Sequence, residues 1–194
     1  KKIIMTKTDI KEDARIFLTD YASYNNGSQF EFGHWVELEK FDTADELYKY
    51  IKNHFAEADK KSPLDEYGSE REEIMITDFE GFPNEIYSES MNFNHLYEYF
   101  ERAEDCGYSK EIIKAYASLG VYGLDNIDQF FQSLEESYCG EFSNDVEFAD
   151  DYCEMHRLTK DHEVFPYTHI DWDRVANELM FSHDEAEGHY FRQL

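Results

Sequence analysis

Apolar and polar residues alternate in short runs near the start of the chain, whereas further along the apolar residues recur with helical spacing. Residues 15–21 (RIFLTDY), 33–38 (GHWVEL) and 73–78 (EIMITD) are rich in β-branched and aromatic side chains, which predicts three strands. Residues 25–27 (NNG) are a turn signal, and their Asn-Gly pair favours a hairpin between the first two strands. The similarity of RIFLTD to EIMITD indicates that the first and third strands belong to one sheet.

Helical spacing begins at residues 47–58, directly after the capping box formed by residues 43–46 (TADE). Residues 189–191 favour a short final strand. Between these segments, further helix starts are predicted at the capping residues Asn94, Ser109, Asp125, Ser143 or Asn144, and Asp171. The pattern therefore predicts an α+β protein with three small domains. They are a β-sheet plus helix over residues 1–88, a helical domain over 89–140 and an acidic mixed α/β domain over 141–194.

The charge of the chain is its most informative feature. Its 194 residues include 44 acidic and 18 basic ones, for a formal net charge of −26, and residues 115–156 contain no lysine or arginine but ten carboxylates. A soluble domain needs a net charge of only about 2–8, and a larger charge destabilises the compact state by self-repulsion. We therefore expect a partner with a strongly positive surface. Direct binding to DNA, RNA or anionic lipid is disfavoured by the same charge.

One predicted helix concentrates this charge on a single face. Glu147, Asp150, Asp151 and Glu154 follow the spacing i, i+3, i+4 and i+7. At a rise of ~1.5 Å per residue the four charges span roughly 10 Å, or one charge per ~2–3 Å. Duplex DNA carries one charge per ~1.7 Å of its axis, so the two densities agree within about a factor of two. The alternative is a face that is merely solvated.

Other kinds of site have weaker support in the sequence. Cys153 and His156, with His162 and His169 beyond, and the pair His183 and His189, match neither HExxH nor a paired Cys/His spacing. No GxSxG, P-loop or GxGxxG motif is present. The sequence thus predicts neither an enzyme nor a metal or cofactor site, and we assign no catalytic residue. Three widely spaced cysteines indicate free thiols in a reducing cytoplasm. No apolar run approaches the ~20 residues of a membrane span, and no secretion signal is predicted.

Three aromatic residues offer an alternative as a stacking surface for single-stranded nucleic acid. Tyr21, Tyr24 and Trp35 are of the right type, but such surfaces need neighbouring cations, and Arg15 and Lys40 are the nearest ones. We therefore expect these rings to pack in the core.

Several short segments resemble one family when they are taken in order. Residues 16–21 (IFLTDY), 24–27 (YNNG) and 33–36 (GHWV) resemble the opening of the ArdA antirestriction proteins. Residues 76–83 (ITDFEGFP) are similar to the most recognisable internal segment of that family. Residues 138–142 (YCGEF), followed by Phe148, Ala149 and Tyr152, resemble its acidic stretch, and residues 170–172 (IDW) with Leu179 its C-terminal part.

The resemblance covers residues 15–191 and implies an elongated, three-part acidic homodimer that imitates bent B-form DNA. Members of this family are carried by conjugative plasmids and transposons, and they occupy the DNA groove of type I restriction–modification enzymes. On this reading, carboxylates pair with lysines and arginines of the methyltransferase–specificity core in place of phosphates. The first candidates are Glu135, Glu136, Glu141, Asp145, Glu147, Asp150, Asp151 and Glu154. Second-rank candidates are Asp125, Asp128, Glu98, Glu101, Glu104 and Asp105. The alternative is an acidic adaptor or chaperone that binds another basic nucleic-acid-binding protein through one patch.

Overall fold

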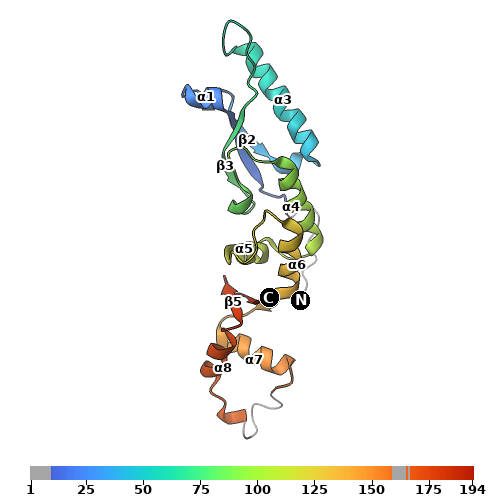
Figure 1. Cartoon of the computed structure of the whole chain (residues 1–194), viewed down its shortest axis with the longest axis vertical. Helices are drawn as coiled ribbons and strands as arrows, with labels where there is room; N and C mark the ends of the chain where they lie inside the picture. Colours follow the sequence, from blue (N-terminus) through green and yellow to red (C-terminus); the bar gives the residue numbers. More distant parts are fainter. Residues whose placement is uncertain (1–9, 159–164, 166) are drawn as a thin grey trace. The chain divides into compact units, whose positions relative to one another are not determined.

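The computed structural model describes residues 10–158, 165 and 167–194. The chain divides into two compact units, Lys1–Ser109 and Lys110–Leu194, and Figure 1 traces it from blue to red. Within the described residues the fold is α+β, as predicted, with eight α-helices and two antiparallel three-stranded sheets. The three-domain division at residues 88 and 140 stays a prediction. In the part of the chain described, every helix is too short or too polar to cross a membrane.

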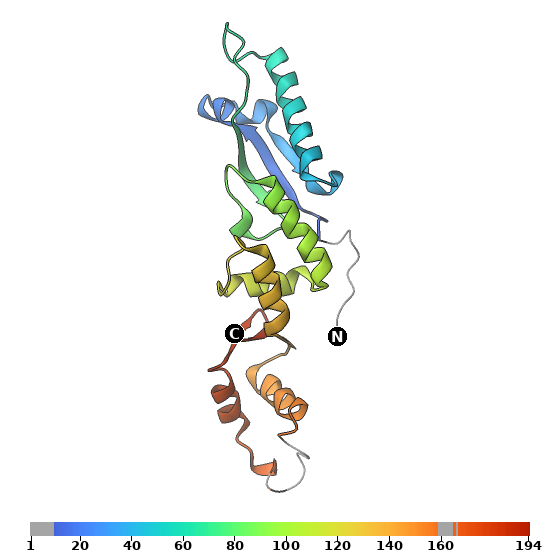
Figure 2. The same ribbon diagram turned by 45° about the vertical axis from the view of Figure 1, so that its right-hand side comes forward.

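The first unit is built on a sheet with the strand order β2-β1-β3 (Figures 1 and 2). Strand β1 (Arg15–Asp20) pairs antiparallel with both β2 (His34–Glu37) and β3 (Ile74–Glu80). The three predicted strands are confirmed, and the first and third are direct neighbours. Alternate residues of a strand face opposite sides of the sheet. One side of β1 carries Ile16 and Leu18, both fully buried.

The predicted hairpin is confirmed, since β1 and β2 are consecutive antiparallel strands, but its connection is longer than an Asn-Gly turn. Two short helices, α1 (Tyr21–Asn25) and α2 (Gln29–Phe32), connect β1 to β2. The carboxylate of Asp20 starts α1 by accepting a hydrogen bond from the backbone N–H of Ser23 at 2.8 Å. Gly27 has a φ of 71°, so this glycine reverses the chain between two helices instead of two strands.

Helix α3 (Ala44–Lys61) begins at the predicted capping box. The Thr43 hydroxyl accepts a hydrogen bond from the backbone N–H of Glu46 at 3.3 Å, and the Glu46 carboxylate accepts one from the backbone N–H of Asp42 at 2.8 Å. Both donors would otherwise lack a partner at the helix start. The apolar stripe predicted for this helix is confirmed, since its buried residues are Ala44, Leu47, Ile51, Phe55 and Ala58.

Two short 3-10 helices and one long helix are the remaining helices among the described residues of the first unit. They are η1 (Leu38–Lys40), η2 (Asn84–Ile86) and α4 (Phe93–Cys106). The side chain of Asn92 caps α4 by accepting a hydrogen bond from the backbone N–H of Asn94 at 3.0 Å. The cap predicted at Asn94 is therefore two residues late, because either asparagine can serve as a cap and only the folded chain selects one.

A buried ion network joins the segment after α3 to the start of α1. The side chain of Arg71 is 5% exposed, and its guanidinium donates to the Asp59 carboxylate and, at 2.9 Å, to the carbonyl of Ser62. Its Nε lies 3.6 Å from the carboxylate of Asp20, which is 1% exposed. The guanidinium also lies over the ring of Phe32, 4.9 Å from its centroid. Because these charges are withdrawn from water, removing one would leave the others uncompensated.

Gly81 lets the chain after β3 pass close to the segment before β1. Its φ is +86°, and a Cβ atom at this position would lie 2.6 Å from the Cα atom of Ala14. Glycine is suited to both conditions, because it lacks the side chain that would disfavour this conformation and fill this space.

Two histidines tie α3 to the end of α2. The rings of His34 and His54 lie 4.3 Å apart, centroid to centroid. Both rings donate to the carbonyl of Phe32, at 3.2 Å and 2.7 Å respectively, and the Tyr50 hydroxyl bonds the second ring nitrogen of His34 at 2.6 Å. Burial lowers the pKa of His34, and the neighbouring His54 lowers it further, while the Phe32 carbonyl acts in the opposite direction. The neutral imidazole of His34 is therefore the form that the fold favours.

The described residues of the second unit form four α-helices and one 3-10 helix. They are α5 (Lys110–Ser118), α6 (Ile127–Ser137), α7 (Asp145–Met155), η3 (Tyr167–His169) and α8 (Trp172–Leu179). The caps predicted at Asn144 and Asp171 are confirmed, since their side chains accept hydrogen bonds from backbone N–H groups in the first turns of α7 and α8. Helix α6 is capped by Asn126, one residue after the predicted Asp125.

A second sheet and an aromatic core hold these helices. Strands β4 (Tyr138–Glu141), β5 (His183–Ala186) and β6 (His189–Arg192) form an antiparallel sheet in the order β4-β6-β5. The strand predicted near residues 189–191 is confirmed as β6, whereas β4 and β5 were not predicted. The ring of Tyr190 in β6 stacks on Phe148 of α7 with centroids 4.5 Å apart.

Candidate functional site

Negative charge is shared equally between the two units. Residues 1–109 contain 25 acidic and 12 basic residues, a net of −13, and residues 110–194 contain 19 and 6, again a net of −13. Twelve of the fourteen candidate carboxylates are exposed, and the other two, Glu104 and Asp150, are partly buried. The candidates therefore lie mostly where a partner could reach them, on both units.

Three of the helices that carry candidate residues have carboxylates in their last turns, where the helix dipole disfavours negative charge. The last turn of α4 contains Glu104 and Asp105, that of α6 contains Glu135 and Glu136, and that of α7 contains Glu154. No basic residue lies in the last turn of any of these three described helices. The peptide dipoles place partial negative charge at a helix C-terminus, so an exposed carboxylate there costs about 0.3–1 kcal/mol. The helix dipole therefore disfavours charge at these five positions, and at the end of α6 the guanidinium of Arg192, which donates to the Glu136 carbonyl at 3.2 Å, offsets part of this cost.

Two candidates at the start of α7 have a structural role. The hydroxyl of Tyr190 donates a hydrogen bond to Asp145 at 2.7 Å. The Glu147 carboxylate accepts a hydrogen bond from the backbone N–H of Ser143 at 2.8 Å, and this bond lowers the pKa of Glu147. Negative charge is also favourable at a helix N-terminus. Asp145 and Glu147 thus stabilise the start of α7, whether or not a partner binds them.

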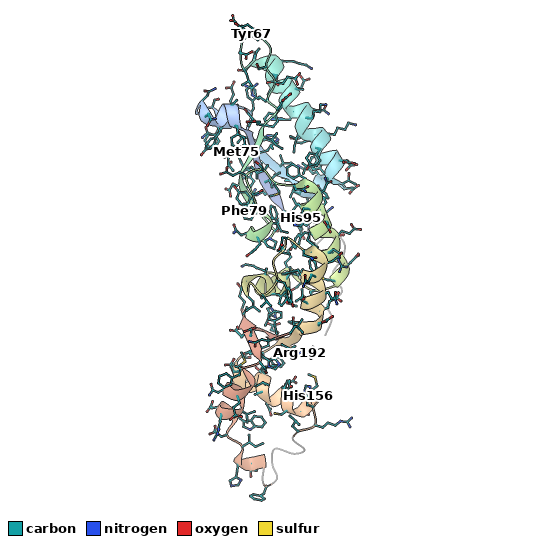
Figure 3. All side chains as sticks on the ribbon, viewed as in Figure 1. Tyr67, Met75, Phe79, His95, His156 and Arg192 are labelled. Carbon is teal, nitrogen blue, oxygen red and sulfur yellow. The ribbon has the colours of Figure 1, made fainter. Side chains whose placement is uncertain are left out.

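The other end of the acidic face of α7 is different. Asp151 and Glu154 are exposed, and neither side chain forms an ion pair or hydrogen bond with another described residue. Asp150 is half-buried beside them. Figure 3 shows His156 just beyond this end of the helix, where its ring stacks on Tyr152 at 4.1 Å. The two exposed carboxylates are free to reorient toward cations of a partner.

The candidates around α6 and β4 are also accessible. Asp125, Glu135 and Glu141 are exposed and make no side-chain ion pair or hydrogen bond with another described residue. Asp128, in the first turn of α6, is exposed as well. The Glu136 carboxylate accepts a hydrogen bond from Gln132 at 2.9 Å, and the guanidinium of Arg192 donates to the backbone carbonyl of Glu136 at 3.2 Å.

Three of the four candidates of the first unit, all but Asp105, line a groove of about 480 Å³ that also contains two carboxylates not among the candidates. The acidic residues that line it are Asp42, Asp45, Glu98, Glu101 and Glu104. Lys11 also lines the groove, with its Nζ 4.7 Å from the centroid of the Tyr97 ring. The sequence pattern attributes Asp42 and Asp45 to the start of α3. Their position beside α4 depends on tertiary packing, which the pattern does not contain.

The residues considered for metal binding are not gathered into one site. The described residues contain no group of three or more His, Cys, Asp or Glu side chains placed to hold a metal ion. His162 lies outside the described residues. His183 and His189 are buried, and His169 is exposed and bonds the hydroxyl of Thr168 at 2.9 Å.

The expectation that Tyr21, Tyr24 and Trp35 pack in the core is wrong. Tyr24 is 47% exposed, and Tyr21 and Trp35 are half-buried. The guanidinium of Arg15 lies over the Trp35 ring, 4.5 Å from its centroid. The strand that carries Trp35 places the ring on the side of the sheet opposite the buried Val36, which is why it stays accessible.

Comparison with known proteins supports the resemblance seen in the sequence. The model of a family described as antirestriction protein (ArdA) matches residues 16–191. No curated protein matches this chain. The matched segment contains both sheets almost entirely and all fourteen candidate carboxylates.

Proposed function

This chain belongs to the ArdA family of antirestriction proteins, and we propose that it blocks restriction by imitating the DNA on which type I restriction–modification enzymes act. Proteins of this family are inhibitors rather than enzymes, and their partner is a restriction–modification enzyme. Under this proposal, exposed carboxylates take the place of DNA phosphates. They pair with lysine and arginine side chains in the DNA-binding groove of the methyltransferase–specificity core.

The carboxylates at the C-terminal ends of α4, α6 and α7 are the observation that carries the proposal. A protein that needed acidic residues for solubility alone could place them at helix N-termini, where they stabilise the helix. Here they occupy the opposite ends, and no lysine or arginine lies in those last turns. A positive surface on a bound partner would compensate these charges, so binding accounts for positions that folding does not.

Binding of this kind would be distributed over many weak contacts. An exposed ion pair contributes only ~0–1 kcal/mol, so single neutralisations should have small effects and grouped ones larger effects. Electrostatic steering should make association fast, and the affinity should fall as salt is added. A single Asp→Asn change that abolished inhibition would contradict this distribution.

We also propose that the protein acts in the cytoplasm as a homodimer. Two chains of net charge −26 repel each other, so the contact between them should be apolar and poor in carboxylates. Added salt screens the repulsion and should favour the dimer. Sedimentation at increasing ionic strength would test this, and a dimer that dissociated as salt rose would contradict it.

The decisive experiment measures protection of unmodified DNA from a purified type I restriction enzyme while this protein is titrated. Mimicry predicts that cleavage is inhibited, that excess competitor DNA relieves the inhibition, and that the protein itself does not bind DNA. An unrelated acidic protein of similar net charge is the control, because it should inhibit far less. Failure to inhibit several type I families at large excess would contradict the proposal and favour the acidic adaptor.

A further inference from the structure

The side of the first sheet opposite its buried residues is accessible and carries alternating aromatic and charged side chains. We call this the outer sheet face and define it by Arg15, Phe17, Trp35, Glu37, Asp78 and Glu80. Arg15 lies between Glu37 and Glu80 across the strands, and Phe17 lies between Trp35 and Asp78. All six residues are half-buried or exposed.

An aromatic cluster occupies the middle of the outer sheet face and continues onto α2. Phe17 contacts Trp35 edge to face, with ring centroids 5.7 Å apart and planes at 84°. Phe30, from α2, contacts Phe17 at 5.8 Å and 69°, and it is 75% exposed. Edge contacts of this kind leave ring faces available to a further group. An aromatic ring this exposed is typical of a binding surface when it joins a larger cluster.

Arg15 shows which chemical group the outer sheet face accommodates. Its guanidinium stacks on the Trp35 ring at 4.5 Å from the centroid, and its Nε donates a hydrogen bond to Glu80 at 2.8 Å. A hollow of about 620 Å³ adjoins this arginine. The charged residues that line it are Glu12, Asp13, Arg15, Glu37, Glu39 and Glu80, so five carboxylates surround one cation. Glu80 pairs with Arg15 and Glu37 pairs with Lys40, whereas the Asp13 and Glu39 side chains form no ion pair with another described residue and leave negative charge for a further cation.

We infer that the outer sheet face binds arginine side chains of a protein partner, by stacking on Phe17, Phe30 and Trp35 and by pairing with the adjacent carboxylates. The arginine guanidinium can stack on a ring and form forked hydrogen bonds to carboxylates at once, whereas the ammonium group of lysine is a compact, strongly hydrated charge. Nucleic-acid bases also stack on aromatic rings, but their phosphates would meet the carboxylates of the hollow. A second copy of this chain would bring the same negative charge.

The inference rests on the proposed function only for the identity of the partner. Aromatic residues and arginine dominate the binding energy of protein interfaces, whereas exposed carboxylates contribute little individually. The outer sheet face would thus give the inhibitor a specific anchor beside its many weak ion pairs. It would also make the inhibitor prefer enzymes that present arginine rather than lysine at this place.

Trp35 can report binding directly in the full chain. The chain has two tryptophans, so Trp172→Phe leaves Trp35 as the fluorescent probe. Hexa-arginine should change its emission in a saturable manner, and hexa-lysine should bind at least about threefold more weakly. Phe30→Ser should weaken hexa-arginine binding about two- to fivefold, whereas Phe30→Tyr, which keeps the ring, should restore it. Phe181→Ser is the matched control, because Phe181 is 84% exposed but belongs to the second unit.

The results that would overturn the inference are distinct from those that would overturn the proposed function. Unchanged Trp35 emission with hexa-arginine, or equal binding of both peptides, would refute it even if the protein inhibits restriction. A larger change in Trp35 emission with single-stranded oligothymidylate than with hexa-arginine would show that the outer sheet face binds nucleic acid instead. A change in Trp35 emission with protein concentration alone, without added peptide, would show that the outer sheet face binds a second copy of the chain. A selective arginine response without inhibition of any type I enzyme would support the face and refute the proposed partner.

Discussion

Neutralising three carboxylates at helix C-termini should make the protein more stable but a weaker inhibitor. The change is Glu135→Gln, Glu136→Gln and Glu154→Gln in one chain, which keeps side-chain shape and removes charge. Each carboxylate faces the negative end of its helix at a cost of about 0.3–1 kcal/mol, so the free energy of unfolding of the second unit should rise by about 1–3 kcal/mol. For a unit of this size, 1 kcal/mol corresponds to about 4–8 °C in Tm. The rise should therefore be readily visible in thermal unfolding followed by circular dichroism.

Inhibition of a type I enzyme should change in the opposite direction. Three lost ion pairs at ~0.5 kcal/mol each, the middle of the usual range, correspond to about a tenfold loss of affinity, since 1.4 kcal/mol is tenfold. The matched control removes the same charge away from helix C-termini, by Glu57→Gln and Glu187→Gln, whose carboxylates pair with lysines, and by Glu66→Gln in an exposed turn. It should neither stabilise the protein nor weaken inhibition comparably. A less stable triple variant would refute the dipole argument. Equal loss of inhibition in both variants would show that net charge, and not position, determines binding.

Three further substitutions test the first unit. Arg71→Met should lower the free energy of unfolding in urea by about 3–5 kcal/mol, because it leaves buried carboxylates without their cation, whereas Arg174→Met at an exposed position should change it by less than about 0.5 kcal/mol. Gly81→Ala should lower Tm more than Gly68→Ala, since both glycines have positive φ but a Cβ atom meets backbone only at Gly81; equal losses would contradict the packing argument. Because the pKa of His34 is lowered in the folded protein, the unfolded chain binds more protons at this residue. The contribution of His34 to the free energy of unfolding is therefore complete above about pH 6.5 and is lost as the pH falls. His34→Gln should reduce the loss of urea stability between about pH 7.5 and about pH 5.5 relative to the unsubstituted chain, and an identical pH dependence in the two proteins would rule out this role.

Elements with a complete local signal could be predicted from the sequence. Strands β1 and β3 combine β-branched and aromatic residues, and α3 combines a capping box with a full apolar stripe. The connection between β1 and β2 could not be predicted, because an Asn-Gly pair suits a hairpin as well as a reversal between short helices. Strand β5 (HDEA) has almost no β-propensity, and it is extended because β6 pairs with it.

The environments of the candidate carboxylates depend on contacts that the sequence does not show. Glu147 and Glu154 are equivalent in the periodic pattern, yet Glu147 completes a cap and Glu154 opposes the dipole of the same helix. Asp145 is bonded by Tyr190, 45 residues further along the chain. The sequence could therefore identify an acidic face on α7, whereas the separation of structural from accessible carboxylates needed the fold.

An acidic surface of this kind has a consequence for the interior. Phe130, Phe131, Phe148 and Tyr190 of the second unit are each at most 2% exposed. Burial of one large ring removes about 150–250 Å² from water, which at ~25 cal/mol per Å² stabilises the fold by up to roughly 4–6 kcal/mol. One such ring offsets several carboxylates at helix C-termini, each of which costs about 0.3–1 kcal/mol. The high aromatic content and the high negative charge are thus two parts of one balance, in which the core stabilises a surface that folding alone would not favour. Binding of a positive partner should then raise the stability of the helix ends, because its cations offset the unfavourable interaction between the carboxylates and the helix dipole. Slower amide hydrogen exchange in the last turns of α4, α6 and α7 on addition of the enzyme would show this directly, and unchanged exchange there would place the contact elsewhere.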